Sequence, residues 1–132
     1  MRFLIHGAIT PEGQAAMTKH GHSLHTPLEL SEDSASPDQL TDAPAELLPL
    51  LAKKQWELFT TDTDFIHRMY EEKVAFSGVI VLLLDDPAVL NDQAPAIDRL
   101  FKRYKRLTPR RLYTITASRV KIRQLPGAAQ TV

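Results

Sequence analysis

The run GVIVLLL, at residues 78–84, is the clearest structural signal in the chain. A continuous apolar run bounded by Gly78 and by Asp85-Asp86-Pro87 is typical of a central parallel strand that is covered on both faces. Parallel neighbours are joined by crossover connections, and these are usually helices. The sequence on either side of the run should therefore alternate between helices and strands.

The rest of the chain has this alternation. Strands are predicted at residues 3–5, 22–26, 56–61, 111–116 and 119–123, the last as an edge strand with alternating charged and apolar residues. Helices are predicted at residues 11–20, 44–54 and 65–74 and within 88–106, and residues 29–44 read as a loop. Pro49 lies inside the second helix, which is therefore kinked, begins late or is in two pieces. The expected fold is a three-layer α/β/α sandwich with a mainly parallel sheet of about five strands and right-handed crossovers.

Length and composition indicate one ordinary globular domain. The 132 residues are 43% hydrophobic and 24% charged, which suits a single domain with a real core. The absence of cysteine excludes disulfides, thiolate metal sites and cysteine nucleophiles. The N-terminus has no apolar signal region and no run is long enough to span a bilayer, so we expect a cytoplasmic protein without a membrane partner.

The net charge of zero hides an asymmetric charge distribution. All 16 acidic residues lie between Glu12 and Asp98, whereas ten of the 16 Lys and Arg lie between Arg99 and Arg123. A basic surface of this kind can hold a phosphate backbone, with Tyr104 or Tyr113 stacking on a base. The candidate nucleic-acid-binding residues are Lys102, Arg103, Lys105, Arg106, Arg110 and Arg111. The alternative is a solvated helix face followed by a charged edge strand.

Several stretches, spread from Met1 to about Pro126, together resemble one family. They are MRFLI followed by a turn and Pro11, KHGHSLH at 19–25, TTDTDF at 60–65, FSGVIVLLL at 76–84 and ITASRVKIRQLP at 115–126. Their order is similar to that of PIN-like nuclease domains, specifically the small stand-alone branch related to toxin ribonucleases. The resemblance implies a single domain over residues 1–126 with a tail at 127–132. It also implies that acidic residues at the carboxyl ends of the strands hold magnesium or manganese to cleave RNA.

The family's acidic residues carry over only in part. Asp62 and Asp64 match its paired acids, one as a metal ligand and the other as the cap of the following helix. The acid expected at the start of the middle helix falls near Glu46 or Asp42. Asp85 follows the most buried strand and is a further candidate ligand at the same edge, although Asp-Asp-Pro is also an ordinary helix start.

His6 stands where the family has its first aspartate. An imidazole there suits manganese, zinc or nickel better than magnesium. His6 can ligate such a metal, act as a general base, or hydrogen-bond an adjacent carboxylate in a metal-free pocket. The spacing of His20, His22 and His25 does not match an established zinc motif, and His20 reads as a helix end.

Two functions remain open at this stage. The first is a toxin-like, metal-dependent endoribonuclease with an altered or lost active site, using magnesium or manganese with Asp62, Asp64, His6 and Glu46 as catalytic residues. The second is a catalytically inactive PIN-like module that binds RNA or a protein. The resemblance implies RNA, an antitoxin-like protein and a second copy of the chain as partners. The chain has no phosphate-binding glycine loop, dinucleotide fingerprint or hydrolase elbow.

Overall fold

The computed structural model describes residues 1–27, 43–83, 93–116 and 119–126. Most of the predicted loop, the tail at 127–132, and the candidate residues Asp42, Asp85 and Asp86 lie outside these ranges.

The sheet has six strands in the order β2-β1-β3-β4-β5-β6. The first five are parallel to their neighbours, and β6 is antiparallel to β5. This confirms the predicted α/β class and mainly parallel sheet, with one strand more than expected. The strands are β1 (Arg2–His6), β2 (Ser23–His25), β3 (Glu57–Thr60), β4 (Ile80–Leu83), β5 (Arg111–Ile115) and β6 (Val120–Gln124).

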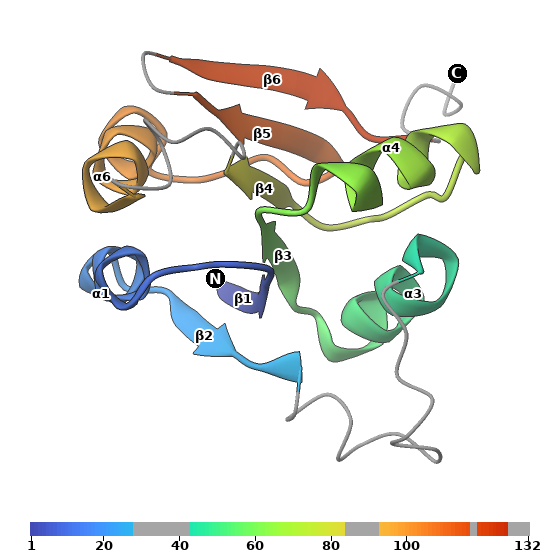
Figure 1. Ribbon diagram of the computed structural model, residues 1–132, viewed down its shortest axis with the longest axis horizontal. Coiled ribbons are helices and arrows are strands. Elements are labelled where there is room, and N and C mark those ends of the chain that lie inside the picture. The colour runs from blue at the N-terminus through green and yellow to red at the C-terminus, as the bar shows by residue number, and fades with distance from the viewer. Residues whose placement is uncertain (28–42, 84–92, 117–118, 127–132) are drawn as a thin grey trace.

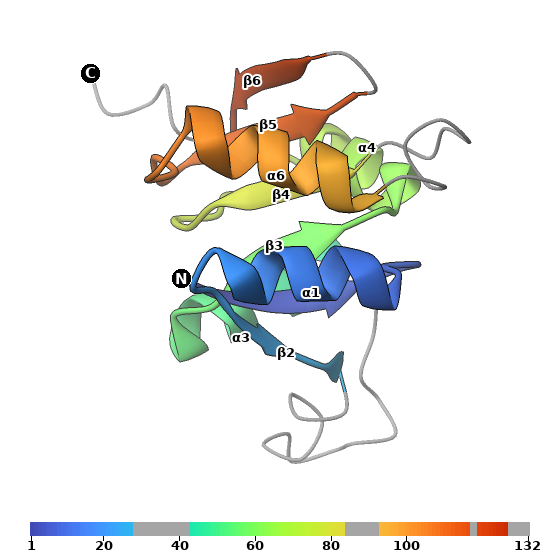
Figure 2. The ribbon, with the colours of Figure 1, turned by 90° about the vertical axis from the view of Figure 1, so that its left-hand side faces the viewer.

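Helices cover both faces of the sheet (Figure 1). The helices α1 (Pro11–Lys19) and α6 (Gln93–Arg103) lie side by side on one face, and α3 (Pro44–Lys54) and α4 (Thr63–Glu71) lie on the other (Figure 2). Strand side chains alternate between the two cores, as the pleat of a strand requires. Phe3 and Phe59 contribute to the core beneath α1 and α6, whereas Leu4 and Leu58 contribute to the core beneath α3 and α4.

The central strand β4 shows why its sequence is continuously apolar. All four of its residues are buried, with Val81 and Leu83 on one face and Ile80 and Leu82 on the other. Both faces of this strand lie in a core, so no polar position interrupts it.

The crossover through α6 differs from the prediction. The connections through α1, α3 and α4 are right-handed, as expected, but β4–α6–β5 is left-handed. The chain moves from β4 to β5 in the direction in which it moved from β3 to β4, yet α6 lies on the opposite face from α4. There α6 packs against α1 and shares a core with apolar side chains of β4 and β5.

Helix α3 is continuous despite Pro49. It runs from Pro44 to Lys54 and is followed by the C-cap residue Gln55, which adopts a left-handed conformation at φ 59°. The alternatives of a late start and of two pieces are therefore wrong. Pro49 is exposed, so the carbonyl that loses its helical partner can bond water instead. No helix of the described residues is long and apolar enough to cross a membrane.

Candidate functional site

The candidate site lies where β1 and β3 end side by side. β2 lies on one side of β1 and β3 lies on the other, so the direction in which successive strands are added to the sheet reverses between β1 and β3. Ligand sites of open α/β sheets form outside the carboxyl ends of the strands at such a point. His6 and Thr60 are register partners there, each the last residue of its strand.

His6 is buried beside a hydroxyl and an aromatic ring. Its side chain faces α4 and is buried, with 7% of the residue exposed. Its Nδ1 atom lies at hydrogen-bond distance, 2.8 Å, from the Thr60 hydroxyl, and its ring lies 5.2 Å from the ring of Phe65. The contact shown here is with the Thr60 hydroxyl, and the three roles predicted for His6 stay predictions.

The two aspartates of TTDTDF have different environments. Asp62 is the N-cap of α4, and its Oδ1 accepts a hydrogen bond from the Phe65 N–H at 3.1 Å. The Asp62 N–H in turn donates to the Thr60 hydroxyl at 2.9 Å, so Thr60 contacts both His6 and the backbone of Asp62. Asp64 lies in the first turn of the helix and is exposed. Of the two predicted roles, the cap therefore belongs to Asp62.

The turn after β1 packs against Thr61 and is hydrogen-bonded to it. The Thr61 N–H donates to the His6 carbonyl at 3.2 Å, and the Ala8 N–H donates to the Thr61 hydroxyl at 2.8 Å. Gly7 lies between these bonds with φ +89°, and a Cβ atom at this position would lie 2.2 Å from Thr61 Oγ1. Only glycine combines this dihedral angle with this approach, so Gly7 sets where His6 ends its strand.

Gln93 anchors the same turn from the other side, and sequence reasoning missed it. The residue is 2% exposed, and its Oε1 accepts hydrogen bonds from the Thr10 N–H at 2.7 Å and the Thr10 hydroxyl at 2.9 Å. Its Nε2 donates to the Ala8 carbonyl at 3.0 Å. A glutamine at the start of an amphipathic helix carries no sequence signal for this role, because the partners lie more than eighty positions away.

Of the remaining candidate acids, only Glu46 lies in the part of the chain that the structure describes. Glu46 lies in the first turn of α3 and is exposed, and Asp85 lies outside the described residues. Among the residues that the structure describes, no three His, Cys, Asp or Glu side chains form a group suited to a metal ion. Among the described residues, the ends of β1 and β3 carry a hydrogen-bonded imidazole, His6, and a capping carboxylate, Asp62. This is not the all-oxygen set that magnesium prefers.

The predicted nucleic-acid-binding residues lie at the opposite end of the sheet. They belong to the last turn of α6, to the connection from α6 to β5, and to the start of β5, so they flank the amino ends of the strands. Lys102 and Lys105 line a hollow with His20, His22 and Phe101. The Arg103 guanidinium lies 5.5 Å from the centroid of the Tyr104 ring. Arg106 lines a second hollow with His22. Arg110 and Arg111 lie at the start of β5.

Of the three histidines that raised a zinc alternative, His20 and His22 share a hollow beside Phe101, whereas His25 lies against Trp56. His20 Nε2 lies 2.8 Å from Asp98 Oδ1, and this hydrogen bond lowers the pKa of Asp98. His22 packs against Phe101, with ring centroids 4.3 Å apart. Burial, then the positive N-terminus and His20, lower the pKa of His22 to about 4. His25 stacks on Trp56 at 4.0 Å.

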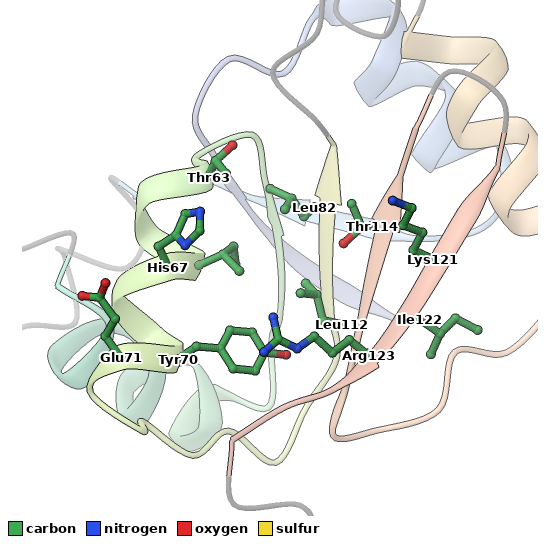
Figure 3. Close-up of a pocket in the computed structure, with 11 residues that line it drawn as sticks. Thr63, His67, Tyr70, Glu71, Leu82, Leu112, Thr114, Lys121, Ile122 and Arg123 are labelled. Atoms are coloured by element: carbon green, nitrogen blue, oxygen red, sulfur yellow. The ribbon is translucent and has the colours of Figure 1, made fainter.

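A groove of 530 Å³ runs beside the candidate site, between α4 and the β5–β6 hairpin (Figure 3). Its residues on α4 begin with Thr63, which directly follows Asp62. Its floor is apolar, and its rim carries hydroxyl and cationic side chains. The lining residues are Thr63, Ile66, His67, Tyr70 and Glu71 from α4, Leu82 from β4, Leu112 and Thr114 from β5, and Lys121, Ile122 and Arg123 from β6. No motif predicted this groove, because it forms only when α4 and β6 meet across β4 and β5.

Comparison with known proteins adds no relative. No family model, curated protein or solved structure matches the chain.

Proposed function

We propose that the chain is a PIN-like RNA-binding protein in which His6 replaces the first carboxylate of an ancestral metal-dependent ribonuclease site. The observation that carries the proposal is the environment of His6. Its imidazole is buried between the Thr60 hydroxyl and the Phe65 ring, at the strand end where a metal-dependent nuclease needs an ionised oxygen ligand. Asp62 also uses one carboxylate oxygen to cap α4.

RNA as the ligand is supported by charge. Beyond Asp98 the chain contains only basic ionisable side chains, apart from tyrosine, and these line hollows at the amino ends of the strands and in the groove beside α4. Cationic side chains of this kind bind the phosphate backbone, and such binding weakens as salt releases counterions.

The test uses the full chain and three versions of position 6. The wild type should bind a fluorescein-labelled single-stranded RNA in EDTA, with an affinity that falls as salt rises, and should not cleave it in manganese. The His6→Asp variant restores the missing carboxylate and should gain manganese binding and manganese-dependent cleavage. The His6→Asn variant, which matches aspartate in size but lacks its charge, should gain neither.

Two results would overturn this proposal. One is a wild type that binds no RNA at low salt. The other is manganese-dependent cleavage by the wild type itself.

A second candidate function, a manganese-dependent ribonuclease that is still active, is favoured by the contact of Thr60 with both His6 and Asp62. Imidazole is a better ligand for manganese than for magnesium. Calorimetric titration with manganese should then show binding that is lost in Asp62→Ala and kept in Glu72→Gln, a remote acid at the end of α4. Binding that is equal in both variants would exclude Asp62 as a ligand.

A further inference from the structure

We infer that the groove between α4 and the β5–β6 hairpin binds one unstacked nucleotide of a single-stranded RNA, with its base on the apolar floor and its phosphate at Lys121. This inference rests on the proposed function, because it says where the RNA lies relative to the strand ends. It assigns binding to residues different from the basic residues 102–111.

The position of the groove connects it to the candidate site. Thr63 is the first residue of α4 and a lining residue of the groove, and Asp62 precedes it as the helix cap. Thr114 and Lys121 are register partners near the carboxyl end of β5. An RNA strand that passes the ends of β1 and β3 therefore reaches this end of the groove first.

The shape of the groove suits one nucleotide rather than a continuous strand. At the far end the Arg123 guanidinium lies 3.8 Å from the Tyr70 ring centroid, and the Tyr70 hydroxyl donates to the Gln124 carbonyl at 2.7 Å. Figure 3 shows Tyr70 and Arg123 meeting across the groove there, whereas no labelled side chain bridges the end between Thr63 and Lys121. The volume of 530 Å³ lies in the range of pockets that hold small ligands.

The lining chemistry suits the two parts of a nucleotide. Leu82 and Leu112 form an apolar floor and are themselves buried, so a planar base can cover them without displacing a polar contact. Lys121 is exposed on the rim beside Thr114, where an ammonium group and a hydroxyl can both meet a phosphate. His67 faces the same opening from α4 (Figure 3).

Charge favours RNA over an apolar peptide as the occupant. The groove is lined by Lys121, Arg123 and His67, with Glu71 as its acidic residue. Arg123 is held against Tyr70, which leaves Lys121 as the cation at the open end. The cationic rim attracts a polyanion such as RNA, whereas an apolar peptide would leave the charges of the rim without an opposite charge.

The experiment measures RNA affinity by fluorescence anisotropy in EDTA, so that binding is read without cleavage. The probe is a labelled eight-nucleotide single-stranded RNA, titrated at several salt concentrations. Thr114→Tyr fills the groove without changing charge and should weaken binding by about tenfold or more, with the salt slope unchanged. Lys121→Gln should weaken binding and reduce the salt slope by about 0.7, the value for one phosphate contact on a single strand.

Matched controls lie on other faces of the molecule. Thr18→Tyr adds the same bulk on the exposed side of α1, and Lys53→Gln removes the same charge from the exposed end of α3. Both should leave the affinity within about twofold of the wild type. Circular dichroism of each variant checks that the fold is kept.

Four outcomes would overturn the inference. Unchanged affinity in both groove variants, with a wild type that binds RNA, would refute the groove and leave the proposed function standing. Weaker binding in Lys121→Gln but not in Thr114→Tyr would mean that the phosphate contact lies outside the groove. Unchanged RNA affinity together with a dimer that dissociates in Thr114→Tyr, measured by sedimentation, would mean that a second copy fills the groove. A wild type that binds no RNA would reject the inference and the proposed function together.

Discussion

Replacing Gln93 by leucine should lower the free energy of unfolding by about 2–4 kcal/mol. The glutamine side chain makes three hydrogen bonds, two from Thr10 and one to Ala8, at 2.7–3.0 Å. Leucine has a similar size but no polar atoms, so it leaves the Thr10 N–H and the Ala8 carbonyl without these partners in a part-buried site. Each bond contributes about 1 kcal/mol net, and an unsatisfied buried group costs about 1–3 kcal/mol.

Urea unfolding followed by circular dichroism measures this effect, and Gln14→Leu is the matched control. The Gln14 side chain donates one longer bond, 3.3 Å, to the Ile9 carbonyl in the same turn, so its loss should cost less than about 1 kcal/mol. In a separate thermal unfolding experiment, a loss of about 3 kcal/mol in Gln93→Leu corresponds to a melting temperature lowered by roughly 10 °C for a chain of this size. Equal costs in the two variants, or a cost below about 1 kcal/mol for Gln93→Leu, would refute the assignment of Gln93 as the anchor of the turn.

Three further predictions concern the same fold. Asp62→Ala removes the cap of α4 and should lower the free energy of unfolding, measured in urea, by about 1 kcal/mol. Asp64→Ala, in the exposed first turn of the helix, should lower it by only a few tenths of a kcal/mol. Equal losses in the two variants would contradict the capping role of Asp62. Gly7→Ala places a methyl group 2.2 Å from Thr61 Oγ1 at φ +89° and should lower the free energy of unfolding by about 1–3 kcal/mol. An unchanged melting temperature would show that the turn can relax to accept the methyl group. The pKa of His22 is about 4 in the folded chain and 6.5 ordinarily, so the unfolded chain binds more protons between these pH values and stability should fall as pH drops from 6.5 to 4. Because His22 is partly exposed, solvent screening limits the loss to on the order of 1 kcal/mol, and a pH profile that is unchanged in His22→Asn would argue against it.

The strands and helices were predictable because their signals are local. The apolar run at 78–84 predicted a strand buried on both faces, and all four residues of β4 are buried. The alternating pattern at 119–123 predicted an edge strand, and β6 is the last strand of the sheet. In β4 the burial of each residue follows from the unbroken apolar run, whereas β6 is exposed along most of its length, Ile122 included.

The face that each helix covers was less predictable. The rule of right-handed crossovers places α6 on the face of α4, but it lies on the face of α1. The amphipathic pattern of α6 indicates that one side of the helix is buried, but it does not indicate which face of the sheet that side packs against. The exposed position of Pro49 on a continuous α3 is a similar case, because the cost of a helical proline depends on what surrounds it.

For the candidate site, sequence reasoning located the ends of two strands but not what their residues contact. TTDTDF predicted that one aspartate caps the following helix, and Asp62 does so. The Thr60 hydroxyl beside His6, the anchor formed by Gln93, and the groove between α4 and β6 each join residues that are far apart in the chain. The basic residues 102–111 are near-continuous in sequence, but the direction of α6 places them at the opposite end of the sheet from His6.

The sequence alone was therefore sufficient for the α/β class, the mainly parallel sheet and a capping aspartate in TTDTDF. These features depend on side-chain spacing over one helical turn or one strand. The partners of His6, the buried Gln93, the left-handed crossover and the groove beside α4 depended on the packed structure. They arise from contacts between elements whose relative positions are set by burial of both faces of the sheet, and no local pattern encodes those positions.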